Sequence, residues 1–195
     1  LTGNAVFFNL LSTQNSWEPW TLSIQDMVVN TITNVTGVEG ELSGNYQLRF
    51  LLSSDTTIEQ SNISVGGSVN LVGASPSFYQ TSGIYFGWTE NFVWLDQCII
   101  EYAGSITSTQ ESQGIGSHYG ITMEFTTSFF VLTHLDIHFS GVIDTLSGSV
   151  FGIAFIGNYL SSGLFESMMI STEGLLRTSS NYGEVIGVAI IHFGE

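Results

Sequence analysis

The sequence contains almost no basic side chains. Lysine is absent, and the two arginines, Arg49 and Arg177, are outnumbered by 17 acidic residues, which gives a formal net charge of −15 at pH 7. Proteins bind nucleic acids and anionic membrane surfaces through clustered positive charge. Because this chain has no such cluster, we expect neither partner.

Cysteine, proline and long apolar runs are also scarce. Cys98 is the single cysteine, which excludes a disulfide within the chain, and only two prolines occur. Every apolar run is shorter than the roughly 18 residues that a membrane-spanning helix needs, so we expect no membrane insertion. The chain begins at Leu1 without a signal peptide, which indicates a processed protein or a fragment.

Apolar residues are plentiful although charged ones are few. Hydrophobic residues make up 43% of the chain and charged residues 10%, so a packed core is expected in a single domain spanning residues 1–195. The tripeptides that begin at Asn34 and Asn62 are sequons for N-glycosylation. Together with the lack of lysine, which limits tryptic cleavage, they favour an extracellular or cell-surface location.

An internal repeat is the strongest pattern in the sequence. The stretches "CIIEYAGSI" and "LDIHFSGVI" place Gly104 and Gly141 in the same position, 37 residues apart. The same frame finds Gly67, Gly174 and, more weakly, Gly37. Apolar and polar residues alternate around each glycine, which predicts a strand with one buried face. The predicted inward columns are Ile63, Ile100, Ile137 and Ile170; Val65, Tyr102 and Phe139; and Val69, Ile106, Ile143 and Leu176.

Each repeat holds about three short strands, and helix signals are rare. A third apolar segment precedes each first strand, and the repeats span 30–43 residues. We predict an all-β fold, a β-solenoid of about five coils whose equivalent residues stack in ladders ~4.8 Å apart. A small β-propeller and a β-sandwich are the alternatives. The second strand of each repeat begins at Gly83, Gly120, Gly152 and Gly187, with looser copies at Tyr46 and Gly3.

Neither end of the chain shows a capping element. An uncapped solenoid exposes unpaired strand edges, so we expect either a part of a longer array or a filament subunit.

The repeats resemble the Gly-punctuated β-helical arrays of surface adhesins. Such arrays include bacterial GLUG-type repeats and the long repeat surface proteins of diplomonad flagellates. The "CYATG" core of a full GLUG repeat is absent from this chain. The resemblance implies an extracellular structural or adhesive role and brings no catalytic residues. The residues that carry it are Gly104-Ser-Ile106, Gly141-Val-Ile143, Gly174-Leu-Leu176 and the "GI" starts at Gly120 and Gly152.

One column of the repeat contains Glu59, Asp96, Thr133 and Glu166. Stacked carboxylates either raise one another's pKa or recruit a cation such as Ca²⁺, and a solvated turn with partly protonated acids is the alternative. We assign no metal-binding residue.

The remaining polar residues do not form a catalytic pattern. Asp96 and Asp136 fall in different columns, although hydrolysis of a glycosidic bond needs two carboxylates that face one groove. His134 and His138 on one strand would be ~13 Å apart, too far to share a metal ion. We expect no enzyme and no cofactor, with surface or loop positions for His118, His134, His138 and His192.

The sequence therefore predicts an extracellular structural protein that self-assembles end to end into a fibre or surface layer. Its partners would be further copies of itself. A carbohydrate-binding adhesin segment is the alternative, in which exposed tryptophans stack on the sugar rings of a glycan.

Overall fold

In a computed structural model, the described residues are 21–38, 45–52, 55–72, 79–89, 92–109, 116–126, 129–158, 160–181 and 183–191. In this part of the chain every regular element is a β-strand, and every strand pairing is parallel. No helix of the described residues has the length and apolar character to cross a membrane. The predicted all-β fold is confirmed.

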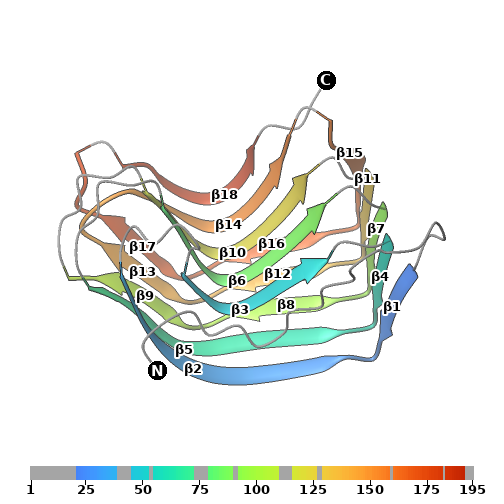
Figure 1. The fold of residues 1–195 in the computed structure, drawn as a ribbon, viewed down its shortest axis with the longest axis horizontal. Helices are drawn as coiled ribbons and strands as arrows, with labels where there is room; N and C mark the ends of the chain where they lie inside the picture. The colour runs from blue at the N-terminus through green and yellow to red at the C-terminus, as the bar shows by residue number, and fades with distance from the viewer. Residues whose placement is uncertain are drawn as a thin grey trace.

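The strands form three sheets, which we number in the order in which the chain enters them (Figure 1). Sheet 1 contains β1 (Thr21–Gln25), β4 (Asp55–Glu59), β7 (Phe92–Asp96), β11 (Phe129–Thr133) and β15 (Ser162–Glu166). Sheet 3 contains β3 (Asn45–Leu52), β6 (Tyr79–Thr89), β10 (Gly116–Thr126), β14 (Ser149–Gly157) and β18 (Val185–Ile191).

Sheet 2 begins with two long strands and continues with pairs of short ones. The long strands are β2 (Val28–Val38) and β5 (Asn62–Val72). The pairs are β8 (Ile99–Tyr102) and β9 (Ser105–Ser108), β12 (Asp136–Phe139) and β13 (Val142–Thr145), and β16 (Met169–Thr172) and β17 (Leu175–Thr178).

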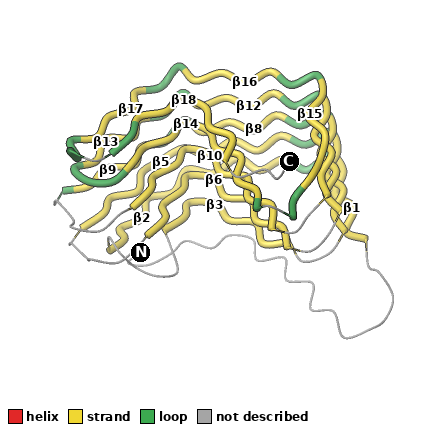
Figure 2. Tube along the Cα trace, turned by 90° about the horizontal axis from the view of Figure 1, so that it is seen from above, coloured by secondary structure: helices red, strands yellow, loops and turns green. Residues whose placement is uncertain are grey.

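The chain visits the three sheets in turn and winds for about four turns, so that five coils are stacked (Figures 1 and 2). Paired residues in neighbouring coils lie between 32 and 37 positions apart in the sequence. The predicted β-solenoid is thus confirmed, rather than a propeller or a sandwich. We call β1, β2 and β3 the first coil and β15, β16, β17 and β18 the last coil.

The predicted inward columns lie in register in sheet 2. Their side chains are fully buried up to the fourth coil, whereas Ile170 and Leu176 in the last coil are half-buried. The paired residues run Ile63–Ile100–Ile137–Ile170, Val65–Tyr102–Phe139 and Val69–Ile106–Ile143–Leu176.

The first coil is registered differently from the sequence alignment. Thr33 pairs with Gly67, so the predicted match of Gly37 to Gly67 is wrong by four residues. Tyr46 pairs with Ser82 rather than with Gly83. In the first coil, Thr33 occupies the column of Gly67 and Gln47 the column of Gly83. Because neither is a glycine, the sequence alignment matched a neighbouring residue instead. The copy predicted at Gly3 lies outside the described residues.

Steric limits explain why glycine recurs in the repeat. A Cβ atom on Gly141 would lie 2.4 Å from the carbonyl oxygen of Gly104 in the preceding coil. A Cβ atom on Gly120 would lie 2.2 Å from the ring of Phe139, which belongs to sheet 2. The glycine at position 141 therefore allows two backbones to approach closely, and the glycine at position 120 leaves room for an aromatic ring.

The corner between sheets 1 and 2 has a left-handed residue in every coil. Non-glycine residues in this conformation cost roughly 1–2 kcal/mol each, so the corner stores strain that the stacked sheets must offset. β11 ends at Thr133, so His134 lies in a corner and not on the predicted strand with His138. The corner residues, with φ between 48° and 53°, are Asp26, Gln60, Gln97, His134 and Ser167.

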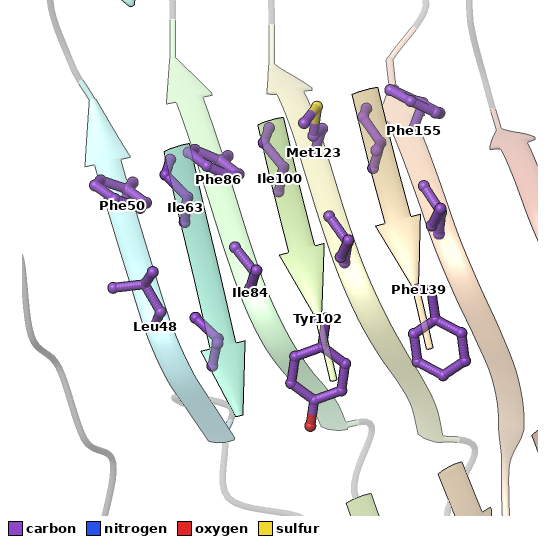
Figure 3. Close-up of a cluster of buried hydrophobic side chains, with 14 of the residues drawn as sticks. Leu48, Phe50, Ile63, Ile84, Phe86, Ile100, Tyr102, Met123, Phe139 and Phe155 are labelled. Carbon is purple, nitrogen blue, oxygen red and sulfur yellow. The ribbon is translucent and has the colours of Figure 1, made fainter. Parts of the chain in front are cut away.

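The core is a set of apolar ladders to which all three sheets contribute, and Figure 3 shows the part formed by sheets 2 and 3. Rings stack from coil to coil, with Phe50 and Phe86 centroids 4.7 Å apart and Trp88 and Phe125 centroids 5.0 Å apart. Such pairs add roughly 0.5–1.5 kcal/mol to the gain from burial. Cys98 is buried and its Sγ lies 3.4 Å from the carbonyl oxygen of Ile58.

Candidate functional site

The carboxylate column of sheet 1 is formed as the sequence predicts. Glu59 pairs with Asp96, Asp96 with Thr133, and Thr133 with Glu166. Thr133 interrupts the acids and donates a hydrogen bond of 2.8 Å to Asp96 Oδ1. The described residues include no group of three or more His, Cys, Asp or Glu side chains placed to hold a metal ion. At this column the structure shows hydrogen bonds, one of them between Asp96 and the exposed His134.

A hydrogen bond joins His134 and Asp96. His134 Nδ1 lies 2.9 Å from Asp96 Oδ1, and His134 is exposed. Desolvation tends to raise the pKa of Asp96, but hydrogen bonds from His134 and Thr133 together hold it below its usual value. His138 contacts Ser171 instead, so the two histidines do not form one site.

His118 lies inside the solenoid, which corrects the predicted surface position. It is fully buried on β10, in a column with Thr81 and Val150. Its Nε2 lies 3.1 Å from the carbonyl oxygen of Ser147. Burial lowers the pKa of His118 to about 4 in spite of this contact. His118 is therefore neutral near pH 7, and no sequence pattern marked it as buried. His192 lies outside the described residues.

Both arginines are engaged within the chain. The guanidinium of Arg49 lies over the rings of Tyr46 and Tyr85, 4.6 and 5.5 Å from their centroids. Arg177 in the last coil pairs with Asp144 in the coil before it. Both positively charged side chains are thus engaged within the chain, whose formal net charge is −15.

Sheet 1 carries an aromatic strip on its outer face, which we define as Phe92, Trp94, Phe129 and Leu164. All four side chains are exposed, Trp94 at 40%. The rings of Phe92 and Phe129 stack with centroids 5.8 Å apart. The carboxylate column runs alongside, because Asp96 follows Trp94 two residues later on β7. Trp88, by contrast, belongs to the core.

The last coil is an open end. Several of its side chains lie in the inward columns of the solenoid, and within the described part of the chain no further coil covers them. Phe165 remains 37% exposed, Val188 41% and Ile190 64%, whereas the paired residues of the fourth coil are fully buried. Among the described residues, β15, β16, β17 and β18 each pair with another strand on one side only. The open end thus combines exposed apolar side chains with strand edges that pair with no other described strand.

The first coil presents a different surface. Its inward side chains Val35, Leu48 and Phe50 are buried. Its outward side chains Val28 and Ile32 are the most exposed large apolar residues of the described chain, at 76% and 80%. The first and last coils therefore differ in how far their inward side chains are covered.

The two sequon asparagines both point outward on sheet 2. Asn34 lies on β2 and Asn62 begins β5, and each side chain is exposed. Asn34 Oδ1 accepts a hydrogen bond of 2.9 Å from Ser68. A glycan on the amide nitrogen of either residue would extend into solvent.

No protein-family model, curated protein or solved structure matches this chain.

Proposed function

We propose that this protein is an extracellular structural protein that self-assembles end to end into a fibre or surface layer. The observation that carries the proposal is the open end, where Phe165, Val188 and Ile190 are exposed although they occupy core positions of the repeat. The resemblance to Gly-punctuated surface arrays agrees with this role.

Burial at the open end supplies the driving force. Each large apolar side chain that becomes fully buried contributes about 1.5–3 kcal/mol. Association costs about 4–15 kcal/mol in lost freedom of motion. Several such side chains, together with hydrogen bonds along four strand edges, are enough to offset the lower part of that cost. Assembly is therefore expected to be reversible and to depend on protein concentration.

Net charge sets the conditions for assembly. A charge of −15 keeps copies apart at neutral pH and low salt, because like charges repel over about one Debye length. Salt or mild acid weakens this repulsion. We expect longer assemblies as the salt concentration rises.

The experiment compares Ile190→Lys with Ile99→Lys. Ile190 lies at the open end, and Ile99 is an exposed outward residue in the third coil. Light scattering and electron microscopy should show that the native chain and Ile99→Lys assemble, while Ile190→Lys stays monomeric. Equal assembly of both variants would rule out the open end as the assembly surface.

Secretion and glycosylation have their own test. Expression through a eukaryotic secretory pathway should add glycan mass at Asn34 and Asn62, which are exposed. The mass should fall after enzymatic deglycosylation and should be absent from the double variant Asn34→Gln, Asn62→Gln. A secreted chain that carries no glycan would remove the sequons from the argument for an extracellular location.

The aromatic strip favours a second candidate function, carbohydrate binding. Exposed rings offer apolar faces to sugars, and the neighbouring Asp96 and Thr133 offer acceptors and a hydroxyl group. Affinity electrophoresis in neutral polysaccharides should show retardation that is lost in Trp94→Ala and kept in Trp94→Phe. If Trp94→Ala migrates like the native chain in every polysaccharide, the strip is not a sugar-binding site.

A further inference from the structure

We propose that the outer face of sheet 1 binds an extended amino-sugar chain, a linear glycan whose sugars carry free ammonium groups. The glycan would lie along the stack of coils, with its rings on the aromatic strip and its ammonium groups beside the carboxylate column. This inference rests on the second candidate function, carbohydrate binding, and adds the charge of the ligand and the direction in which it lies.

The exposed aromatic rings of the molecule gather on one sheet. Among the residues whose burial is described, the exposed Phe, Tyr and Trp side chains are Phe92, Trp94, Phe129 and Phe165, and all other side chains of these three types are buried. The four exposed rings belong to sheet 1, whose strands stack at the right of Figure 1. Contiguous apolar patches on a soluble protein mark interaction sites.

Contacts between neighbouring coils hold the rings of the strip in place. Trp94 Nε1 donates a hydrogen bond of 3.4 Å to Thr133 Oγ1 in the next coil. Thr133 in turn donates to Asp96 Oδ1 at 2.8 Å. Phe92 and Phe129 stack on each other across the same two coils. Because the rings are already ordered, a ligand would lose little binding energy to fixing them.

The spacing of the coils fits a glycan better than a peptide. Side chains in one column recur at the coil spacing of about 4.8 Å. A pyranose ring is about as wide as this spacing, so successive sugars of an extended chain can lie over successive coils. An extended peptide brings side chains to one face only every ~6.6 Å, out of step with the coils. The strip spans β7, β11 and β15, which gives room for about three sugars at one sugar per coil.

The charge of sheet 1 favours a cationic ligand. Its described strands contain acidic side chains and neither of the two arginines, and His134 at the adjoining corner is already hydrogen-bonded to Asp96. An anionic glycan would be repelled, and a neutral one would leave the carboxylates unused. Ammonium groups on the sugars complement them. The acidic side chains of sheet 1 are Asp55, Glu59, Asp96 and Glu166.

Two of these carboxylates are available to a ligand. Within the described part of the chain, no hydrogen bond or ion pair involves the side chains of Glu59 and Glu166. Both belong to the carboxylate column, Glu59 one coil before Asp96 and Glu166 two coils after it. A hydrogen bond between an ammonium group and a carboxylate is assisted by charge and is stronger than one between neutral groups. Glu59 and Glu166 are therefore the expected contacts of the sugar ammonium groups.

Calorimetric titration with a β-1,4-linked glucosamine hexasaccharide tests the proposal. The comparison ligand is the N-acetylglucosamine hexasaccharide, which has the same backbone and no charge. Titrations at low salt and mildly acidic pH keep the sugar amines protonated. The glucosamine hexasaccharide should bind at least about tenfold more tightly than the acetylated one, because only its charge complements the carboxylates. Added salt should narrow the difference.

Two variants that remove the same charge from different sheets test the place of binding. Glu166→Gln should weaken binding of the glucosamine hexasaccharide about threefold, the size expected for an exposed ion pair. Glu101→Gln is the control, because Glu101 lies on β8 in sheet 2, and it should weaken binding much less. Trp94→Ala should abolish binding of both hexasaccharides. Equal weakening by the two glutamine variants would overturn the inference, because net charge rather than the carboxylate column would then attract the ligand.

The remaining outcomes separate the inference from carbohydrate binding itself. Equal affinity for the two hexasaccharides would overturn the inference and leave carbohydrate binding intact. A lysine hexapeptide that binds as tightly as the glucosamine hexasaccharide, and is likewise lost in Trp94→Ala, would also overturn it, because the face would then accept cationic peptides. Binding of neither hexasaccharide would overturn the inference, and affinity electrophoresis in neutral polysaccharides would then decide the carbohydrate-binding candidate separately.

Discussion

The first and last coils contain the same inward columns but bury them differently. Leu48 and Val188 occupy one column, and Phe50 and Ile190 another, yet the residues of the first coil are 0% exposed and those of the last coil are 41% and 64% exposed. An apolar column therefore defines which side chains point inward but not how well each is covered. Within the chain, the inward side chains of the last coil remain partly exposed to water.

The largest expected effect separates the two coils directly. Phe50→Ala removes a fully buried ring that stacks on Phe86, so we expect a loss of about 3–5 kcal/mol in the free energy of unfolding. Phe165→Ala removes a ring that is already partly hydrated, so its loss should be smaller, about 1–2 kcal/mol. Urea denaturation of dilute, monomeric protein measures both. Equal losses would mean that the last coil is as well packed as the first.

The next effect concerns the middle of the stack, where His118 is buried. Its folded pKa of about 4 lies below the unfolded value near 6.5, so the unfolded chain binds more protons between these two pH values. The stability present above pH 6.5 should fall by about 3 kcal/mol as the pH drops toward 4.

His118→Thr copies Thr81, the residue at the same position in the preceding coil. In this variant the fall in stability between pH 6.5 and 4 should be much shallower. Chemical denaturation at several pH values compares the two chains. A fall of the same size in both would assign the acid sensitivity to other groups.

A smaller effect tests the replacement of glycine in the first coil. Gln47 stands opposite Gly83, and its Oε1 accepts a hydrogen bond of 2.6 Å from the hydroxyl group of Tyr102. Gln47 Nε2 donates to the carbonyl oxygens of Thr33 and Gly66. Tyr102→Phe leaves the buried Gln47 oxygen without this donor and should cost about 1–3 kcal/mol.

A double-mutant cycle with Gln47→Ala measures the coupling between the two side chains. We expect a coupling free energy of at least about 0.5 kcal/mol, because the two groups are in contact. Additive losses would show that the hydrogen bond contributes nothing to the closure of the first coil.

The smallest effect comes from the strained corners. Gln60→Gly places glycine at φ 48°, which removes steric strain but adds entropy to the unfolded chain. We expect a net gain of about 0.5 kcal/mol in the second coil. Ser167→Gly, with φ 52° in the last coil, should gain less if this coil opens locally before the rest. Thermal denaturation compares the two variants, and a larger gain from Ser167→Gly would contradict local opening.

The fold was readable from the sequence because alternation and repeat length reinforce one another. The column Ile63, Ile100 and Ile137 shows a one-sided strand and a constant interval at the same time. In the first coil this agreement breaks down, because Thr33 and Gln47 replace the two glycines. Their side chains fit by hydrogen bonding, which leaves no periodic signal in the sequence.

The candidate surfaces were less predictable than the fold. Trp94 points outward into the aromatic strip, whereas Trp88 points inward into the core. Composition does not reveal which of the two tryptophans points inward. His118 likewise sits in a column that holds Thr81 and Val150, so its burial depends on the register of β10. The exposure of the inward side chains in the last coil could not be predicted either, because it depends on which coil lacks a neighbouring coil in space.

Hydrogen exchange as a function of protein concentration tests the central claim, that the solenoid associates through its last coil. Amides on the free edges of β15, β16, β17 and β18 should exchange quickly in dilute protein and gain protection as the concentration rises. Amides of β6 and β10 in the middle of sheet 3 should not change. Protection that appears with concentration elsewhere, while the four strands of the last coil continue to exchange quickly, would contradict the account.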